Sequence, residues 1–155
     1  MITEIRPIVK NDLIDLKEVL DSSELFPSEY LEEMISDYLD NPETHDIWFT
    51  CVDQNKAVAI GYCVPEKFTE GTYNLLAIGV SKNVQRKGIA SKMMNYIEDY
   101  LNKNLGRILI VETSSDNAQI GARNFYKKIG YEEVATIKDF WKDGEDKIIF
   151  RKRIN

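Results

Sequence analysis

The sequence predicts an α/β protein in which helices cover a mixed β-sheet. Apolar residues recur at helical spacing in four segments, and short apolar runs that are typical of strands separate these segments. The length of 155 residues suits one compact domain, and no repeat, low-complexity tract or Pro/Gly/Ser linker interrupts the chain. We therefore expect a single domain that spans residues 1–155.

The first half of the chain is expected to form one strand, two helices and three further strands. Asn11 and Asp12 offer capping oxygens to the first helix, Pro27 is a favoured first-turn residue for the second, and Pro42 ends it. The apolar stripes of these helices comprise Leu13, Leu16, Leu20, then Leu31, Met34, Ile35 and Tyr38. The strands are expected at residues 2–7, 47–52, 57–64 and 73–80.

The second half is expected to form a long helix, a strand, another helix and a closing antiparallel pair. The long helix carries Ile89, Met93, Ile97 and Tyr100 at helical spacing. Gly130 is the expected left-handed terminator of the helix at residues 118–129. The strands are expected at residues 107–113, 131–137 and 147–154. The predicted order is therefore β-α-α-β-β-β-α-β-α-β-β.

Composition limits the classes of function. The formal net charge of −6 argues against a broad nucleic-acid binder, and suits an amine substrate, although acidity more often serves only solubility. Cys51 and Cys63 lack ligand spacing and are expected to be reduced core thiols, while a single histidine, His45, cannot build a histidine metal site. No apolar run approaches the ~18 residues of a membrane span, and the start of the chain lacks the apolar region of a signal peptide. We expect a cytoplasmic protein without a metal or a membrane partner.

The stretch from Gln85 to Ala90 carries the clearest chemistry. It follows a strand that ends at Val80 and opens a helix around residues 87–89. The first N–H groups of a helix have no intrahelical partner and carry partial positive charge, so they can hold a phosphate. Gly88 and Ala90 allow close approach to the backbone, and Arg86 and Lys87 add cationic side chains. This segment is a candidate pyrophosphate site.

Two further observations affect how specifically this segment indicates a phosphate site. It lacks the GxGxxG of a dinucleotide fold and the GK[ST] of a P-loop, and any helix start with a glycine resembles it. Gly79, inside the preceding strand, is a second clue, because an interior strand glycine often marks a bulge or a close ligand approach. Considered alone, Gly79 is equally well explained by packing.

The sequence resembles the GNAT superfamily of N-acetyltransferases in two motifs. The segment Gln85-Arg-Lys-Gly-Ile-Ala90 is similar to the family's coenzyme A motif, Q/R-x-x-G-x-G/A. Ala122-Arg-Asn-Phe-Tyr-Lys-Lys-Ile-Gly-Tyr131 is similar to its second signature, A-x-x-x-Y-x-x-x-G-F/Y. The predicted order of elements matches that fold over essentially the whole chain. The resemblance implies a mostly antiparallel sheet and acetyl transfer from acetyl-coenzyme A to a primary amine.

The resemblance also implies the residues that bind the cofactor. The backbone of Ile78, Gly79 and Val80 would pair with the pantetheine arm, and an N–H there would stabilise an oxyanion. The amides that would hold the pyrophosphate belong to Gln85, Arg86, Lys87, Gly88, Ile89 and Ala90, with Ser91 beside them. Many relatives have a cofactor-contacting asparagine where this chain has Gln119, while Asn117 stands two residues earlier. Either amide fits that role, and both also fit a simple helix-capping role.

Two side chains are candidates for proton transfer. Glu112, at the end of an apolar strand, resembles the base of branches that acetylate ribosomal-protein N-termini, but two extra residues separate it from the tyrosine. An exposed strand-end glutamate is an equally good reading. Tyr126 matches the family's usual acid, which protonates the departing thiolate, and its helical stripe also suits a core tyrosine.

Several alternatives stay open at this point. The acceptor is a small amine, an antibiotic, a lysine or a peptide N-terminus, and a non-catalytic acyl-coenzyme A-binding module is the main rival function. Another nucleotide-phosphate binder is the third reading. The loop at residues 139–146 either lines the acceptor pocket, contacts a second copy in a homodimer, or folds Phe140 and Trp141 onto the domain.

Overall fold

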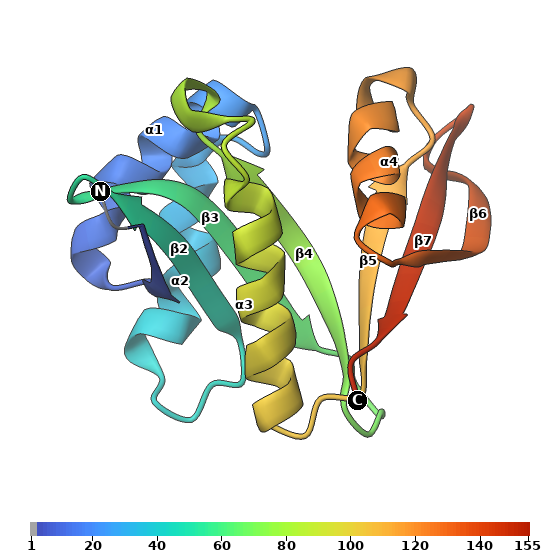
Figure 1. Ribbon diagram of the computed structural model, residues 1–155, viewed down its shortest axis with the longest axis horizontal. Coiled ribbons are helices and arrows are strands. Elements are labelled where there is room, and N and C mark those ends of the chain that lie inside the picture. Colours follow the sequence, from blue (N-terminus) through green and yellow to red (C-terminus); the bar gives the residue numbers. More distant parts are fainter. Residues whose placement is uncertain (1–2) are drawn as a thin grey trace. The chain divides into compact units, whose positions relative to one another are not determined.

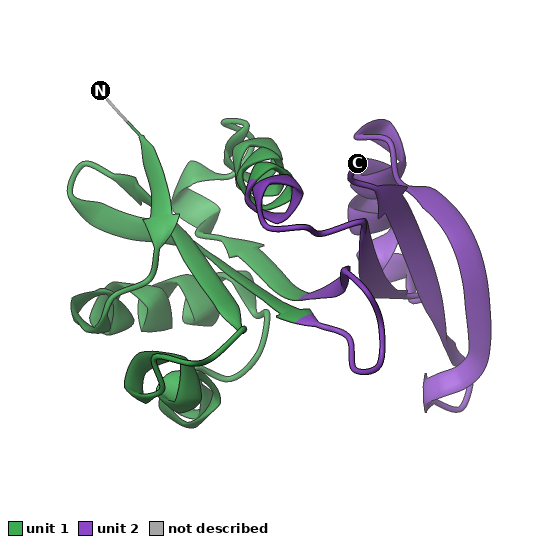
Figure 2. Cartoon of the chain, turned by 90° about the horizontal axis from the view of Figure 1, so that it is seen from below, with its two compact units in different colours: residues 1–64, 76–99 green, residues 65–75, 100–155 purple. Residues whose placement is uncertain are grey.

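The computed structural model describes residues 3–155, which form two compact units (Figure 2). Unit 1 holds the described residues up to Val64 together with Leu76–Asp99. Unit 2 holds Pro65–Leu75 and Tyr100–Asn155. Two strands and one helix have residues in both units, so neither unit is a single continuous segment.

The order of elements and the class of sheet confirm the sequence predictions. The strands and α-helices are β1 (Glu4–Pro7), α1 (Leu13–Ser23), α2 (Leu31–Asp40), β2 (Ile47–Asp53), β3 (Lys56–Pro65), β4 (Thr72–Val80), α3 (Ile89–Lys103), β5 (Ile108–Ser114), α4 (Ile120–Lys128), β6 (Glu132–Lys142) and β7 (Glu145–Arg153). The sheet has seven strands in the order β1-β2-β3-β4-β5-β7-β6. Strands β4 and β5 run parallel, whereas β1–β2, β2–β3, β5–β7 and β6–β7 are antiparallel. Ile2, the first residue of the predicted opening strand, lies outside the described residues.

Unit 1 is a three-layer arrangement around β1, β2 and β3. Helices α1 and α2 cover one face of these strands, and α3 covers the other (Figure 1). Neighbouring residues of β2 point to opposite faces, so Trp48 packs into the α1–α2 core while Phe49 stacks on Tyr96 of α3 at 5.5 Å between ring centroids. Each such buried aromatic stabilises the fold by about 1.5–3 kcal/mol.

A glycine makes room for the second of these aromatics. Phe49 pairs with Gly61 across β2 and β3, and its ring lies over the position that a β-carbon at Gly61 would occupy. The glycine therefore lets α3 pack close to the sheet. Cys51 and Cys63 on the same strands are free and buried, as predicted, and burial raises the pKa of both thiols.

The predicted capping of α1 by Asp12 is wrong. Asp12 ends a short 3₁₀ turn (Lys10–Asp12) that leads into α1, and as the N-cap residue of α1 it makes no side-chain capping bond to that helix. Its carboxylate instead accepts a hydrogen bond at 2.8 Å from the N–H of Val9, the N-cap residue of the 3₁₀ turn, as in a capping box. It also accepts hydrogen bonds from Arg6 of β1 at 2.8 and 2.9 Å, so Asp12 ties the start of the helical segment to β1.

The closing hairpin of unit 2 has longer strands than the sequence suggests. Residues 139–146, expected to be a loop, mostly belong to β6 and β7, and Lys142 pairs with Glu145 around a two-residue turn, Asp143-Gly144. An Asp-Gly pair is a strong hairpin signal. The pairing register shifts between Ile137 and Lys142, which marks an irregular stretch of β6. Among residues 3–155, no helix combines the length and apolar character that a bilayer span requires.

Candidate active site

The loop between β4 and α3 belongs to unit 1 and leads directly into a helix. A 3₁₀ turn (Lys82–Val84) follows β4, and α3 starts at Ile89, within the predicted range. Arg86 and Gly88 both adopt left-handed backbone, with φ of 69° and 79°. A β-carbon added at Gly88 would meet no atom within 4 Å, so the space above this residue is open.

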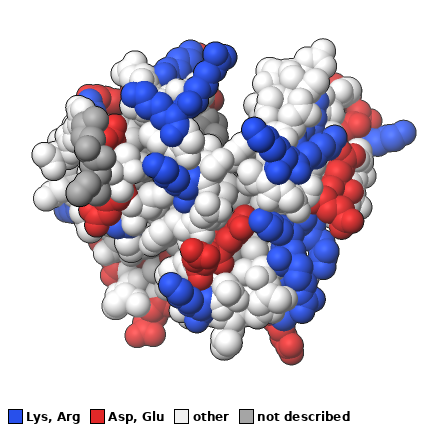
Figure 3. Space-filling model, viewed as in Figure 1, with Lys and Arg blue, Asp and Glu red and all other residues white. Residues whose placement is uncertain are grey.

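The start of α3 has the properties of an anion site. The N–H of Lys92 donates to the carbonyl of Gly88 at 3.1 Å, so the amides that precede Lys92 come before the first full helical hydrogen bond. Those amides belong to Ile89, Ala90 and Ser91. Figure 3 shows blue side chains gathered over this end of α3, where the sequence has Lys82, Arg86, Lys87 and Lys92 and no acidic residue. Free amides and cationic side chains together favour a phosphate.

The end of β4 is held by contacts within unit 1. The side-chain amide of Gln85 donates to the carbonyl of Val80 at 2.9 Å, which closes the loop onto the strand. Gly79 lies under the end of α1, because an added β-carbon would be 3.0 Å from Leu25 and 3.3 Å from Ser23. Close packing therefore accounts for Gly79. Ile78, Gly79 and Val80 are all half-buried.

The proton-transfer candidates lie in unit 2, on opposite faces of the β5–β7 pair. Glu112 is paired with Ile149, and directly opposed residues of antiparallel strands share a face. Val111 is paired with Phe150, which is therefore on the other face. Tyr126 of α4 packs on Phe150, with 5.9 Å between ring centroids. The structure thus separates Glu112 from Tyr126 by the thickness of the strand pair.

Glu112 forms an ion pair with a nearly buried lysine. The Nζ atom of Lys147 lies 3.0 Å from Oε2 of Glu112, and the two side chains are 9% and 24% exposed, respectively. The ring of Phe140 covers the same ammonium at 3.6 Å from its centroid. Glu112 is therefore held by a specific partner, unlike a solvated strand-end glutamate.

Tyr126 is almost enclosed by aromatic rings. Its side chain is 5% exposed, and its ring lies 5.4 Å from Phe125, 5.8 Å from Tyr131 and 5.9 Å from Phe150, between centroids. Within residues 3–155 its hydroxyl has no hydrogen-bond partner. Burial raises the pKa of Tyr126 above its usual range, so the phenol is protonated at neutral pH.

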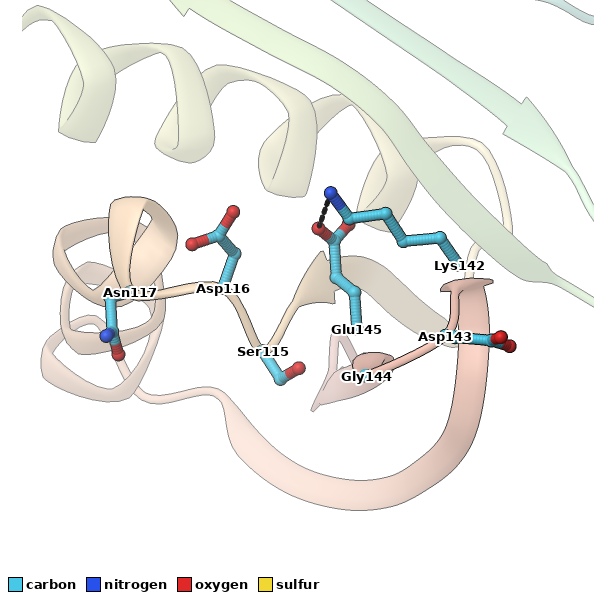
Figure 4. Close-up of a pocket in the computed structure, with 7 residues that line it drawn as sticks. All are labelled: Ser115, Asp116, Asn117, Lys142, Asp143, Gly144 and Glu145. Carbon is cyan, nitrogen blue, oxygen red and sulfur yellow. Dashed lines mark ion pairs between the residues drawn. The ribbon is translucent and has the colours of Figure 1, made fainter.

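Asn117 and Gln119 are exposed at the start of α4. They bound a 3₁₀ turn, Asn117–Gln119, whose preceding residue Asp116 accepts a hydrogen bond from the N–H of Ala118 at 3.2 Å. Gln119 is the N-cap residue of α4, yet its side chain makes no capping bond. Asn117 lines a polar hollow of about 290 Å³ (Figure 4), together with Ser115, Asp116, Lys142, Asp143, Gly144 and Glu145.

The aromatics of the 139–146 segment fold back onto unit 2. The indole N–H of Trp141 donates to the carbonyl of Thr113 at 3.2 Å, and Phe140 meets Trp141 edge to face at 4.8 Å between centroids. Both remain 46% exposed. Of the three alternatives for this segment, the contacts of Trp141 agree with folding onto the domain.

The structure also reveals a group that sequence reasoning missed, Lys147, the partner of Glu112. It adds a second role for Gln85, already a predicted cofactor-binding residue, because its side chain fastens the loop to β4. No sequence pattern singles out Lys147, because a lysine beside Asp146 is expected to be solvated. In the part of the chain from residue 3 onward, no three His, Cys, Asp or Glu side chains are grouped as metal ligands.

Comparisons with known proteins agree on one family and fold. The sequence profile of the acetyltransferase (GNAT) family matches residues 13–131. A GNAT-family structure from Desulfovibrio desulfuricans superposes with a TM-score of 0.92 at 23% identity, covering 99% of this chain and 100% of that one. The ribosomal-protein-S18-alanine N-acetyltransferase from Escherichia coli superposes with a TM-score of 0.81 at 19% identity, covering 99% and 95%.

An aminoglycoside 6′-N-acetyltransferase complexed with coenzyme A is also similar, with a TM-score of 0.79 at 20% identity and coverage of 100% and 98%. No curated protein sequence matches the chain at a significant level. At these identities the structural likenesses establish the fold.

Proposed function

Since this chain belongs to the acetyltransferase (GNAT) family, we propose that it transfers an acetyl group from acetyl-coenzyme A to a primary amine. The amine nitrogen bonds to the thioester carbonyl carbon and the carbon–sulfur bond breaks. One proton leaves the amine and one joins the departing thiolate. No metal takes part in the proposed reaction.

The left-handed Gly88 at the start of α3 is the observation that carries this proposal. Its φ of 79° and the open space above it leave the backbone accessible to a large anion. Residues 85–91 would hold the pyrophosphate of the donor through their amides, with Arg86 and Lys87 supplying positive charge. The backbone of Ile78, Gly79 and Val80 would take the pantetheine arm and stabilise the oxyanion. An amide of Asn117 or Gln119, both exposed, would add a contact to the donor.

Glu112 is proposed to take the proton from the amine, directly or through water. An alkylammonium has a pKa of about 10.4, so an amine acceptor needs a base at neutral pH. Tyr126 is proposed to protonate the thiolate, because a phenol whose pKa is raised by burial still carries its proton. The nitrogen and the sulfur are bonded to the same carbon, so a base and an acid on opposite faces of the β5–β7 pair do not both contact the reacting atoms directly. In this proposal Tyr126 donates to the sulfur and Glu112 acts on the nitrogen through water.

Release of free thiol from acetyl-coenzyme A across a panel of amines tests the proposal. The panel includes an aminoglycoside and an alanine-terminated peptide, because two structural neighbours are named for acceptors of these kinds. Thiol release that depends on the amine is the expected result. Binding of acetyl-coenzyme A without release for any amine would favour a non-catalytic acyl-coenzyme A-binding module, and no binding would reject the donor site.

A further inference from the structure

We propose that Lys147 is a positioning residue that holds the carboxylate of Glu112 in its working orientation, an inference that rests on the proposed role of Glu112 as the base. Lys147 lies on β7 and Glu112 on β5, which are paired antiparallel. Lys147 is opposite Ser114, and Glu112 is opposite Ile149. The lysine therefore reaches the glutamate diagonally across the same face of the strand pair.

Because Lys147 is buried, its ammonium cannot readily replace Glu112 with solvent as a partner. Lys147 is 7% exposed as a residue, and removing an ammonium from water is strongly unfavourable unless a counter-charge lies beside it. Within residues 3–155, Glu112 is the ion-pair partner found for Lys147, with Nζ at 3.0 Å from Oε2. If Glu112 turned away, the ammonium would be nearly buried and unpaired. The pair therefore restricts the glutamate, which as a free side chain would sample several rotamers.

The aromatic segment of β6 fixes the lysine in turn. The ammonium lies 3.6 Å from the centroid of Phe140 and 5.6 Å from that of Trp141, within the range of a cation–π contact. Trp141 is anchored by its hydrogen bond to the carbonyl of Thr113, the residue after Glu112. The irregular register of β6 brings these rings over Lys147. Rings of β6, one of them anchored to β5, thus hold the ammonium of β7 that contacts one carboxylate oxygen of Glu112.

Steady-state kinetics of Lys147→Met and Lys147→Arg test the role. Methionine keeps the length of the side chain without its charge, so kcat should fall, by up to about 10²-fold, while the KM for acetyl-coenzyme A stays unchanged. Arginine restores a cation and should recover part of kcat. Lys138→Met is the matched control, because Lys138 lies on β6 of the same hairpin and is exposed, and it should behave like wild type. A wild-type kcat for Lys147→Met overturns the proposal.

A double-mutant cycle on stability tests the ion pair, on which the positioning role depends, without any need for activity. The unfolding equilibria of Glu112→Gln, Lys147→Met and the double variant should show a coupling of roughly 2-fold to 10²-fold in the equilibrium constant. Zero coupling overturns the positioning role. If the wild type releases no thiol with any amine, the proposed function fails while the cycle still tests the pair. If Glu112→Gln keeps full activity, the base is elsewhere and a positioning role for Lys147 in catalysis is excluded.

Discussion

The fold gives the two candidate proton-transfer residues, Tyr126 and Glu112, different surroundings. Tyr126 is enclosed by three rings, and desolvation by burial raises the pKa of its phenol. Glu112 is partly exposed and is controlled by one charged neighbour at 3.0 Å. A general acid has to carry a proton before the transfer and a general base has to accept one, so the two proposed roles need different surroundings.

Replacing Tyr126 by Phe tests the acid. The variant deletes only a hydroxyl that has no hydrogen-bond partner in residues 3–155, so we expect the melting temperature and the affinity for acetyl-coenzyme A to stay nearly unchanged. Turnover should fall by about 10²–10⁴-fold, the usual contribution of general acid catalysis. Because burial raises the pKa of Tyr126, its ionisation should add no falling limb to the wild-type kcat profile below about pH 10.

The control for this change is Tyr62→Phe. Tyr62 is a second tyrosine whose pKa is raised, to about 12, chiefly by burial, and it lies on β3 beside Asp46. We expect this variant to keep its turnover. Near-normal turnover in Tyr126→Phe, together with a loss of stability, would show that Tyr126 is a core residue.

At the scale of elements, one ion pair fastens the first helix to the first strand. Arg6 of β1 contacts both oxygens of Asp12 at 2.8 and 2.9 Å, just before α1 begins. The hydrogen bond from Arg6 holds the pKa of Asp12 below its usual value. A carboxyl with a lower pKa in the folded chain stabilises the fold above its unfolded pKa, near 3.9, and this contribution is lost as the pH falls through the folded pKa.

Replacing Asp12 by Asn should therefore destabilise the protein in a pH-dependent way. At pH 7 we expect the free energy of unfolding to fall by about 1–3 kcal/mol, the worth of hydrogen bonds to a charged group. The difference from wild type should shrink as the pH is lowered below about 4. Urea unfolding at several pH values measures it. Glu32→Gln, which breaks an exposed ion pair with Lys17, is the control and should change little; a pH-independent loss in Asp12→Asn would contradict the electrostatic explanation.

At the scale of the whole molecule, ligand binding and folding are linked. The chain forms two compact units, and both β4 and α3 contribute residues to each. A ligand that binds only the native state raises its apparent stability by about 2.7 kcal/mol at a hundredfold excess over Kd. For a chain of this size that corresponds to a rise in Tm of roughly 5–10 °C.

Acetyl-coenzyme A should produce this rise, and Gly88→Trp should abolish it. The tryptophan would fill the open space above the left-handed Gly88, and its own strain costs roughly 1–2 kcal/mol. Gly144→Trp is the matched control, because Gly144 has a φ of 83° and equally open surroundings but lies in the β6–β7 turn. It should lose similar stability and keep the ligand shift. A full shift in a folded Gly88→Trp variant would place the donor elsewhere.

Local sequence patterns were sufficient to predict the order of the elements and where α3 begins. Ile89, Met93 and Ile97 recur at helical spacing, and a glycine precedes them, so the whole signal for this helix lies within one segment of the chain. The structure confirms the helix that this signal predicts. The closing hairpin was harder to predict, because an irregular register at 138–141 breaks the period-two pattern that marks a strand. The capping role of Asp12 was mispredicted because its stronger partner, Arg6, lies on another element.

The sequence by itself determined the family and the types and order of the elements, and it identified Gln85–Ala90 as the candidate pyrophosphate site. These features depend on neighbours in the chain and on the direction in which a side chain leaves its own helix or strand. Only the tertiary structure decided that Glu112 and Tyr126 lie on opposite faces of the β5–β7 pair, and that Lys147 is the partner of Glu112. Both facts follow from the register between strands, which long-range pairing fixes and which no local pattern encodes.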